Sequence, residues 1–587
     1  MMRRQQCPLP VLLRAPPFRP RLPDLGVFPC SWEEFEADSF GGDPETALSK
    51  FEELARRRLG GDYTNPHGLK PDSSRRVLLE LPSNPLEARQ AWRIAKSGWY
   101  ANEITVSVST RSQPSISHLL RGAAAEGARI VRRPINPHAL LEHSAVVLTF
   151  GMGDLGLLGL AYDRAVWCMD KKIPSQANRL KAASAIVYGT RYHDPFFGTE
   201  TTFDDILVHL SDWRDIVQDN REIAACMGMA WWKKARMRQF LAQAPGSPRF
   251  MRHTASAVRA ARDSNGAVAC WSTRVPSGLE GRVAQEGQSI LRIEDGFIRS
   301  LGLGSDLLPP ASIVLDKSGI YYDPASPSDL ETILSTQVFD PLLIERARCL
   351  ARRIVEERIS KYGTHSRVEA GTPIRVKSRE RRHVILVPGQ VSDDQSVLKG
   401  GAGVYSNLEL IRRVRQVEPD AWIIYRPHPD VDAGHRAGAI ADDAALLVAD
   451  EIHRGGSMPG LLGEIDEVHT LTSLTGFEAL MRGIKVSTWG QPFYSGWGLT
   501  TDFAAPTGRR NRILTLEELI AATLIIYPRY LDPVSGLPCS PETLIGRLGE
   551  PGLWRTGMRT SLRRKQGALT KNVTKFCHEL ARVFSHD

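Results

Sequence analysis

The chain has 587 residues, too many for one hydrophobic core, so we expect roughly two to four domains. A hydrophobic fraction of 42% and a charged fraction of 24% are ordinary for a soluble globular protein. No apolar run approaches the roughly eighteen residues that cross a bilayer, and no nucleic-acid-binding motif appears. The net charge of +9 suits anionic substrates or a membrane surface and does not demand nucleic acid.

The eight cysteines are scattered and show no metal-binding spacing. This usage is typical of reduced thiols in the cytoplasm. We therefore expect a cytoplasmic protein. No metal-ligand cluster is visible in the sequence, and neither a metal ion nor a cofactor is expected at the site.

The first part of the chain, residues 1–75, shows no clear apolar period and is predicted to be an unassigned, partly disordered extension. Its first 25 residues hold five Arg and six Pro. The apolar stretch there is too short for a signal peptide, so a targeting role is the less favoured alternative.

Short apolar strands alternate with helical stretches along most of the remaining chain. Residues 76–245, 266–365 and 383–545 each show this alternation, and basic, polar linkers separate them. The pattern predicts parallel sheets with helices on both faces. We expect an α/β fold in which two Rossmann-like domains, 266–365 and 383–545, face a cleft, preceded by another α/β module at 76–245.

An internal repeat relates the first module to the last. The segment ALLEHSAVVLTFGMGDLGLLGLAYDRAVWCM begins at residue 139, and GLLGEIDEVHTLTSLTGFEALMRGIKVSTWG begins at residue 460. At three paired positions, polar residues of the later copy are replaced: Thr472, Ser473 and Glu478 by Gly151, Met152 and Leu157. The first copy is interpreted as a degenerate, partial module without chemistry; chance similarity of two βα units is the alternative.

An acid pair follows an apolar strand in LRIEDGFIRSLGLGS. Glu294 and Asp295 are adjacent, so on an extended segment their side chains point to opposite sides. One carboxylate can face the cleft as a general acid or base while the other supports the loop. The alternative is a turn or helix-capping acid. Arg299 follows, and the GLGS segment alone is weak evidence for a phosphate loop.

A second acid pair, Asp393 and Asp394, follows a strand and a Pro-Gly turn in VPGQVSDDQSV, which also holds Gln390. Asp394 is a candidate nucleophile or base from the second domain. Helix capping by Ser392 or Asp393 is the alternative. Two carboxylate pairs, one per domain, could flank a glycosidic centre.

A rigid turn, YRPHPD, ends the apolar strand AWIIY. In this turn His428 could donate to a phosphate oxygen or, when protonated, neutralise a leaving phosphate. Arg426 could pair with a carboxylate or phosphate. A structural His428, and an Arg426 bound to an Asp across the domain, are the alternatives.

A hydroxyl-rich turn opens a short apolar helix in TLTSLTGFEAL. Thr472, Ser473 and Thr475, with the backbone N–H groups at the helix start, suit the phosphate and ribose of a nucleotide. Glu478 could hold ribose hydroxyls. A capped helix explains one hydroxyl but not three. The following FYSGWG segment is interpreted as a wall of the cleft or, alternatively, a packed loop.

Together these motifs resemble the capsular polysaccharide β-Kdo transferases, or capsule export proteins, of Gram-negative bacteria, where Kdo is 3-deoxy-D-manno-octulosonic acid. The matching stretches are EDGFIRSLGLGSDLLPPASIVLDKSGIYYD, VPGQVSDDQSV, YRPHPDV, DEVHTLTSLTGFEALMRG and PFYSGWGLTTD, within about 266–545. The resemblance implies a GT-B-like glycosyltransferase, a CMP-Kdo donor, a retaining outcome and a short Kdo linker built on a phospholipid acceptor.

Roles carried over by motif make Glu294 and Asp295 the acid pair, and His428 with Pro429 the His-Pro motif. Retention implies double displacement, for which the preferred assignment is Asp394 as nucleophile and Asp295 as acid/base. The predicted donor-binding residues are Arg299, Gln390, Arg426, Pro429, Thr472, Ser473, Thr475, Gly476 and Glu478.

The basic tail, residues 546–587, has apolar residues spaced between its charges and suits an anionic inner-membrane surface or a solvated tail. Expected partners are the CMP-sugar donor, a glycolipid acceptor and possible contacts with a second Kdo transferase or the capsule export machinery. A non-catalytic assembly or export factor, and a transferase of another nonulosonic acid, are the rival functions.

Overall fold

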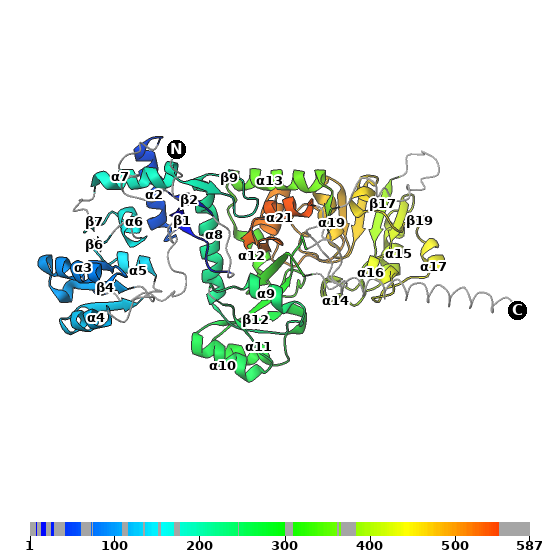
Figure 1. Cartoon of the computed structure of the whole chain (residues 1–587). Helices are drawn as coiled ribbons and strands as arrows, with labels where there is room; N and C mark the ends of the chain where they lie inside the picture. Colours follow the sequence, from blue (N-terminus) through cyan, green and yellow to red (C-terminus); the bar gives the residue numbers. More distant parts are fainter. Residues whose placement is uncertain are drawn as a thin grey trace. The chain divides into compact units, whose positions relative to one another are not determined.

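The structure is a computed structural model, drawn in Figure 1. It describes residues 7–8, 13–18, 25–28, 41–59, 72, 74–108, 116–132, 136–150, 154–169, 176–244, 246–299, 309–360, 363–364 and 383–550. The chain forms two compact units. Unit 1 comprises Met1–Glu222 and Leu241–Pro248, and unit 2 comprises Ile223–Phe240 and Arg249–Asp587.

Unit 1 is built on a parallel sheet with the strand order β5-β4-β3-β6-β7. Its strands are β3 (Val77–Leu81), β4 (Ile104–Val108), β5 (Arg129–Arg132), β6 (Val146–Thr149) and β7 (Ala165–Cys168). An antiparallel sheet joins β1 (Cys7–Pro8), β2 (Gly26–Phe28), β8 (Arg191–His193) and β9 (Glu200–Thr201).

The helices of unit 1 begin where the sequence supplies caps. In α3 (Pro85–Gly98) the Asn84 side chain accepts from the Leu86 amide at 2.9 Å, and Ala88, Ala91 and Trp92 bury one face. The other helices are α2 (Pro44–Arg56), α4 (Ile116–Ala125), α5 (Pro137–Leu141), α6 (Asp154–Ala161), α7 (Gln176–Ser184) and α8 (Phe203–Arg221).

The first large sheet of unit 2 has the order β11-β10-β12-β13-β14-β23-β24, parallel from β11 to β13 and antiparallel beyond. Its strands are β10 (Ile223–Met227), β11 (Arg249–Phe250), β12 (Ala267–Trp271), β13 (Ile290–Asp295), β14 (Ser312–Asp316), β23 (Pro528–Leu531) and β24 (Pro538–Cys539). Its helices are α9 (Lys234–Phe240), α10 (Thr254–Ser264), α11 (Leu279–Gln285), α12 (Asp329–Thr336), α13 (Pro341–Glu356) and α21 (Pro541–Leu548).

This sheet starts earlier in the chain than the sequence predicts. Strands β10 and β11 fall within the segments assigned to the first module and its linker, yet they pair with each other and β10 pairs with β12. The domain that begins at residue 266 in the sequence analysis therefore takes its edge strands from residues 223–250.

The second large sheet of unit 2 is parallel, with the order β19-β18-β17-β20-β21-β22. Its strands are β17 (Val384–Pro388), β18 (Trp422–Arg426), β19 (Glu451–Ile452), β20 (Glu467–Thr470), β21 (Lys485–Thr488) and β22 (Thr501–Asp502). This is the 3-2-1-4-5-6 order of a Rossmann sheet, whose strand order reverses between β17 and β20.

Short helices connect these strands, and their apolar faces supply the core. In α15 (Asn407–Val417) the buried residues are Asn407, Leu410, Ile411 and Val414, a spacing that faces one side of a helix. The others are α14 (Gln395–Gly400), α16 (Pro429–Asp432), α17 (Asp442–Leu446), α18 (Met458–Leu462), α19 (Leu474–Leu480) and α20 (Leu516–Ile520).

The two large sheets of unit 2 share one aromatic core. The Phe297 ring, just after β13, lies 4.8 Å from the Phe493 ring and 4.9 Å from the Tyr321 ring, measured between centroids. Phe493 in turn lies 5.4 Å from Phe477 of α19. The end of β13 is thereby fixed against the helix that follows β20. The predicted α/β fold with Rossmann-like domains is confirmed.

The sequence repeat has a structural counterpart. The order β5-β4-β3-β6-β7 in unit 1 matches β19-β18-β17-β20-β21 in unit 2. A π-helical turn follows in each, η3 (Ala185–Gly189) and η6 (Ala521–Ile526). Tyr192 donates to the Ile186 carbonyl at 2.6 Å, and Tyr530 donates to the Leu524 carbonyl at 2.7 Å.

Several sequence predictions fall on positions outside the described residues. These are most of residues 1–75, the degenerate positions Gly151 and Met152, the GLGS segment, most of the linker before residue 383, and the tail from residue 551. Among the helices that the structure describes, none is long and apolar enough to cross a membrane.

Candidate functional site

The acid pair ends strand β13, as predicted. Asp295 is held between two cations: its Oδ1 lies 3.2 Å from Lys233 Nζ, and its Oδ2 accepts from Arg299 Nε at 2.9 Å. The Arg299 side chain is only 2% exposed, so its charge is directed at Asp295 rather than at water. These two ion pairs fix the position of the Asp295 carboxylate.

Glu294 sits in a different environment from its neighbour. It accepts from the Ser272 hydroxyl and, at 3.1 Å, from the Asp295 amide. Burial, and then the charge of Asp295, raises the pKa of Glu294 to about 7. A carboxyl group whose pKa is raised to near neutral pH is typical of acid/base sites.

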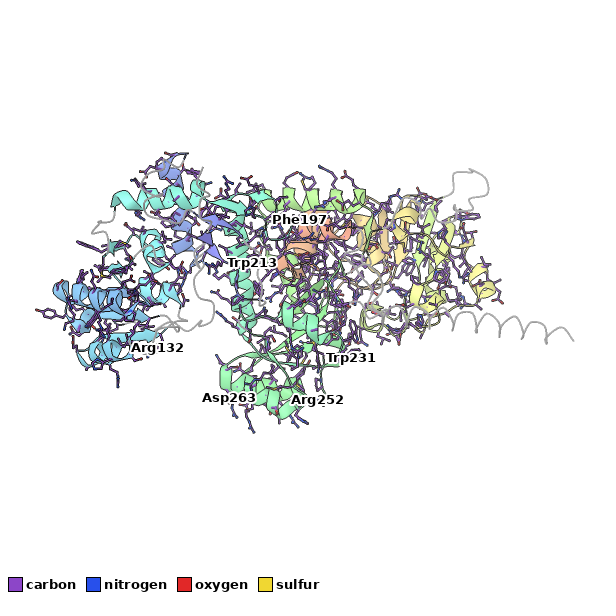
Figure 2. All side chains as sticks on the ribbon, in the orientation of Figure 1. Arg132, Phe197, Trp213, Trp231, Arg252 and Asp263 are labelled. Carbon is purple, nitrogen blue, oxygen red and sulfur yellow. The ribbon has the colours of Figure 1, made fainter. Side chains whose placement is uncertain are left out.

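Lys233 is a site residue that the sequence analysis missed. It lies between β10 and α9, and Trp231 two residues earlier is 64% exposed (Figure 2). Burial lowers the pKa of Lys233, while the charges of Asp295 and Glu294 act to raise it. The sequence does carry a feature that could have identified it: a pair of lysines shortly after the apolar segment IAACM. The sequence analysis did not recognise that segment as a strand.

Tyr321 links the acid pair to the second sheet. Its ring is partly buried and packs on Phe297 and Phe493. Burial together with the charges of Glu294, Asp394 and Asp295 raises the pKa of its hydroxyl. The neighbouring Tyr322 also has its pKa raised, by burial first and by Glu294, Asp323 and Asp394 among the charges. The carboxylates of both sheets thus act on one pair of tyrosines. That Asp295 and Asp394 face one cleft stays a prediction.

Asp394 caps helix α14. Its Oδ1 accepts from the Ser396 amide at 2.9 Å and from the Ser396 hydroxyl at 2.7 Å. The capping alternative named Ser392 or Asp393, whereas the cap is Asp394 itself, and Asp393 instead pairs with Arg436 at 3.0 Å. The cap fixes the Asp394 carboxylate at the start of a short helix.

Gln390 fastens the end of β17 to the turn after β20, at the point where the strand order reverses. Its Nε2 donates to Thr472 Oγ1 at 2.9 Å, and its Oε1 accepts from the Thr472 amide at 3.0 Å. Thr472 Oγ1 donates onward to Ser396 Oγ at 3.3 Å. Open α/β sheets bind ligands at such a reversal, outside the carboxyl ends of the strands.

The hydroxyl-rich turn caps α19. Ser473 Oγ accepts from the Thr475 amide at 3.2 Å, and Thr475 is buried. A Cβ on Gly476 would lie 2.3 Å from the Tyr494 hydroxyl oxygen, so packing requires glycine here. Glu478 is 6% exposed, and its charge acts on Arg482.

His428 caps α16, which begins at Pro429. The Asp430 amide donates to His428 Nδ1 at 3.1 Å, so the neutral ring carries its proton on Nε2. The turn lies against the end of β17, because the Gly389 amide donates to the Arg426 carbonyl at 2.7 Å. Contacts therefore run continuously from this turn through Gln390 and Thr472 to the Asp394 cap.

Arg426 ends β18, just before this turn, and its side chain is partly exposed. Its Nη2 donates to the Gly456 carbonyl at 2.7 Å. Its Nη1 is buried and has no hydrogen-bond partner within the part of the chain that the structure describes. Burial lowers the pKa of Arg426. An unpaired buried guanidinium nitrogen is suited to an anionic ligand.

The FYSGWG segment is a packed loop. Phe493, Tyr494 and Trp497 are buried, and Trp497 Nε1 donates to the Phe493 carbonyl at 2.9 Å. Arg510 Nη1 donates to the carbonyls of Pro492 and Ser495 at 2.5 and 2.9 Å. The sequence analysis offered a cleft wall or a packed loop, and the buried aromatic side chains fit the packed loop.

Comparison with known proteins gives a consistent picture. Residues 266–530 match the family model described as capsule polysaccharide biosynthesis protein. The chain is 38% identical over 403 residues to the capsule polysaccharide modification protein LipA of Neisseria meningitidis serogroup A, covering 67% of this chain and 56% of that protein. It is 44% identical over 246 residues to the lipopolysaccharide-processing protein LpsZ of Rhizobium meliloti, covering 41% and 54%.

Among solved structures, the chain is similar to the β-Kdo 2,4 transferase of Thermosulfurimonas dismutans KpsC, with 29% identity and a TM-score of 0.47. That match covers 55% of this chain and 98% of the other. The β-Kdo 2,7 transferase of the same protein gives 32% identity, a TM-score of 0.45, and coverage of 55% and 97%. The chain spans about half the length of the curated relatives it matches.

Proposed function

This chain belongs to the capsule polysaccharide biosynthesis protein family through residues 266–530, and from that membership we propose that it is a retaining glycosyltransferase that moves β-Kdo from CMP-Kdo to a lipid-linked Kdo acceptor. The observation that carries the proposal is the packing that joins the acid pair to the second sheet. Phe297, two residues after Asp295, packs on Tyr321 and on Phe493, and Tyr321 also packs on Phe493 and is acted on by Glu294, Asp295 and Asp394. Sugar transfer with retention needs carboxylates on both sides of the anomeric carbon.

The first step uses Asp394 as nucleophile. A carboxylate oxygen of Asp394 bonds to the anomeric carbon of Kdo, the bond from that carbon to the CMP phosphate oxygen breaks, and CMP leaves with the bonding electrons. The Ser396 contacts to Oδ1 fix the direction of the carboxylate. This step needs no proton on the leaving phosphate.

The second step needs a base, and the contacts favour Glu294 over Asp295. Asp295 is bound by Lys233 and Arg299, whereas the pKa of Glu294 is raised to about 7. Glu294 takes the proton of the acceptor hydroxyl while the acceptor oxygen displaces Asp394 from the anomeric carbon. Two inversions return the original configuration.

Binding of the CMP phosphate is assigned to the carboxyl ends of β18 and β20. His428 can donate from Nε2, and no residue that the structure describes hydrogen-bonds to the buried Arg426 Nη1. Gln390 connects this turn to the hydroxyl-bearing turn before α19. Its Nε2 donates to Thr472 Oγ1, and Ser473 Oγ donates to Thr475 Oγ1. A positively charged, donor-rich end of the sheet lowers the free energy of a departing phosphate.

The proposal is tested with the full chain, CMP-Kdo and a Kdo-primed lipid. CMP release that depends on the acceptor supports the transferase. A Kdo adduct on the peptide that contains Asp394, found by mass spectrometry and absent in Asp394→Asn, supports double displacement. No CMP release with any lipid or Kdo-primed acceptor would instead favour an assembly or export factor.

Donor identity is tested in the same assay. We propose Kdo as the sugar, so excess CMP-sialic acid should compete poorly with CMP-Kdo. Faster turnover of CMP-sialic acid would assign the chain to another nonulosonic acid. The acceptor lipid also implies peripheral binding at the inner membrane, which co-sedimentation of the full chain with anionic and neutral vesicles would test.

A further inference from the structure

Lys233 reaches the acid pair from outside the segment that matches the family model. The match begins at residue 266, whereas Lys233 lies between β10 and α9. Strand β10 is parallel to β12, and β12 is parallel to β13, so all three end at the same edge of the sheet. That shared edge places Lys233 beside Trp271 at the end of β12 and Asp295 at the end of β13.

Lys233 makes two contacts there that fix its ammonium group. Its Nζ lies 3.2 Å from Asp295 Oδ1 and 3.2 Å from the centroid of the Trp271 ring, at the end of β12. The side chain is only 10% exposed. A buried ammonium over an aromatic face and against a carboxylate is oriented more tightly than a surface lysine.

We propose that Lys233 is a positioning residue that, together with Arg299, holds Asp295 as a fixed carboxylate beside Glu294, the proton-accepting group of the transferase. The inference rests on the proposed function for its catalytic consequence. The contacts of Lys233 with Asp295 and with the Trp271 ring do not depend on which sugar donor the protein uses.

The charges around the pair determine what loss of Lys233 does. Within the described residues, Glu294 and Asp295 come from β13, Arg299 from the turn after it, Tyr321 from the segment after β14, and Asp394 from the second sheet. Lys233 is one of the cations in this acidic group, so its removal leaves more negative charge unbalanced. Glu294, whose pKa the Lys233 charge lowers, then binds its proton more tightly.

The kinetic test compares Lys233→Met, Lys233→Arg and the control Lys234→Met in acceptor-dependent CMP release. Lys233→Met should lower kcat about 30- to 100-fold and shift the pH dependence of kcat to higher pH by about one unit, with KM for CMP-Kdo changed less than about three-fold. Lys233→Arg keeps the charge and should recover most of the rate. Unchanged kcat and pH profile in Lys233→Met would overturn the proposal.

A second measurement does not need turnover. Denaturant unfolding of the same variants at pH 5 and pH 8 should show that Lys233→Met is destabilised more at pH 8, with the ratio of unfolding constants to wild type growing about ten-fold. A pH-independent difference would mean that Lys233 only packs on Trp271, which overturns the inference. If wild type releases no CMP while this pH dependence is present, the transferase proposal fails and the Lys233–Asp295 pair stands.

Discussion

The Tyr494 hydroxyl donates a hydrogen bond of 2.5 Å to the backbone carbonyl of Ser473, the residue that caps α19. The same hydroxyl oxygen would lie 2.3 Å from a Cβ on Gly476. One tyrosine of the FYSGWG loop therefore fixes both the cap of the hydroxyl-rich turn and the glycine one turn later. The loop acts on the site through this contact.

Gly476→Ala should destabilise the protein strongly, because the new Cβ forces Tyr494 away from the Ser473 carbonyl and leaves buried polar groups unpaired. We expect a loss of about 2–4 kcal/mol in the free energy of unfolding, measured by denaturant titration. Gly281→Ala in α11 is the control, since nothing lies within 4 Å of its Cβ position. Equal stability of the two variants would contradict the close contact.

The sequence identified the site's strand ends because each is an apolar run followed by a polar turn. VILVP before Gln390 and WIIYR before His428 are β17 and β18, side by side in one sheet. Parallel strands align their carboxyl ends, so proximity of these turns follows from the pattern alone. The local pattern does not predict that position 476 must be glycine. That requirement comes from the close approach of Tyr494, which belongs to a later segment of the chain.

Lys233 and Asp394 show two further limits of sequence reasoning. Lys233 was missed because β10 lies in a segment that resembles the first module, and only pairing with β12 assigns it to the second unit. For Asp394, several neighbouring polar residues can cap a helix, and local sequence does not choose among them. The structure gives the cap to Asp394, whose side chain accepts from the Ser396 amide.

Turnover should depend on ionisation of Glu294, whose pKa burial and the Asp295 charge raise to about 7. As a base Glu294 acts in its ionised form, so kcat of acceptor-dependent CMP release should rise as pH increases through about 7 and level off above it. Glu294→Gln should remove this limb and lower kcat by about 10²–10⁴-fold. Glu280→Gln, which alters an exposed pair with Arg292 on the same sheet, should keep the wild-type profile.

The raised pKa of Glu294 also predicts that the free energy of unfolding falls over the pH range in which kcat rises. The folded chain holds the Glu294 proton up to about pH 7, whereas the unfolded chain releases it near pH 4.3. Glu294 therefore contributes stability below about pH 4 that is lost as pH rises through about 7. The free energy of unfolding should fall less steeply over this window in Glu294→Gln, as measured by denaturant titration at several pH values. Parallel curves for the two proteins would contradict the raised pKa.

Glu467 should make the second sheet sensitive to acid. Burial acts to raise its pKa, but Ser487 Oγ at 2.7 Å, His383 Nε2 at 2.9 Å and His469 Nε2 at 3.0 Å outweigh burial and lower the pKa to about 2. The stabilisation is complete above the unfolded value near pH 4.3 and is lost as pH falls toward about 2.

Replacing Glu467 by Gln should remove this acid sensitivity. We expect wild type to lose on the order of 1–3 kcal/mol more than Glu467→Gln between pH 5 and pH 2, followed by circular dichroism in denaturant. Glu464→Gln, at an exposed position on the preceding turn, is the matched control and should behave as wild type. An identical acid transition in the Glu467 and Glu464 variants would show that the three contacts do not hold the carboxylate.

Arg426 should bind the anionic part of the nucleotide through its buried Nη1. Arg426→Met removes a charge-assisted hydrogen bond of about 1.5–3 kcal/mol, so the Kd for CMP, measured by titration calorimetry, should rise about 10- to 150-fold. Arg426→Lys should recover only part of the affinity, since an ammonium cannot serve both the Gly456 carbonyl and the ligand in the same geometry. Arg454→Met is the control, because Arg454 is already paired with Asp432 at 2.9 Å and Asp442 at 2.6 Å. If CMP binds the Arg426 and Arg454 variants equally well, Nη1 does not face the nucleotide, and the phosphate must be held by His428 and the hydroxyls of the turn before α19 alone.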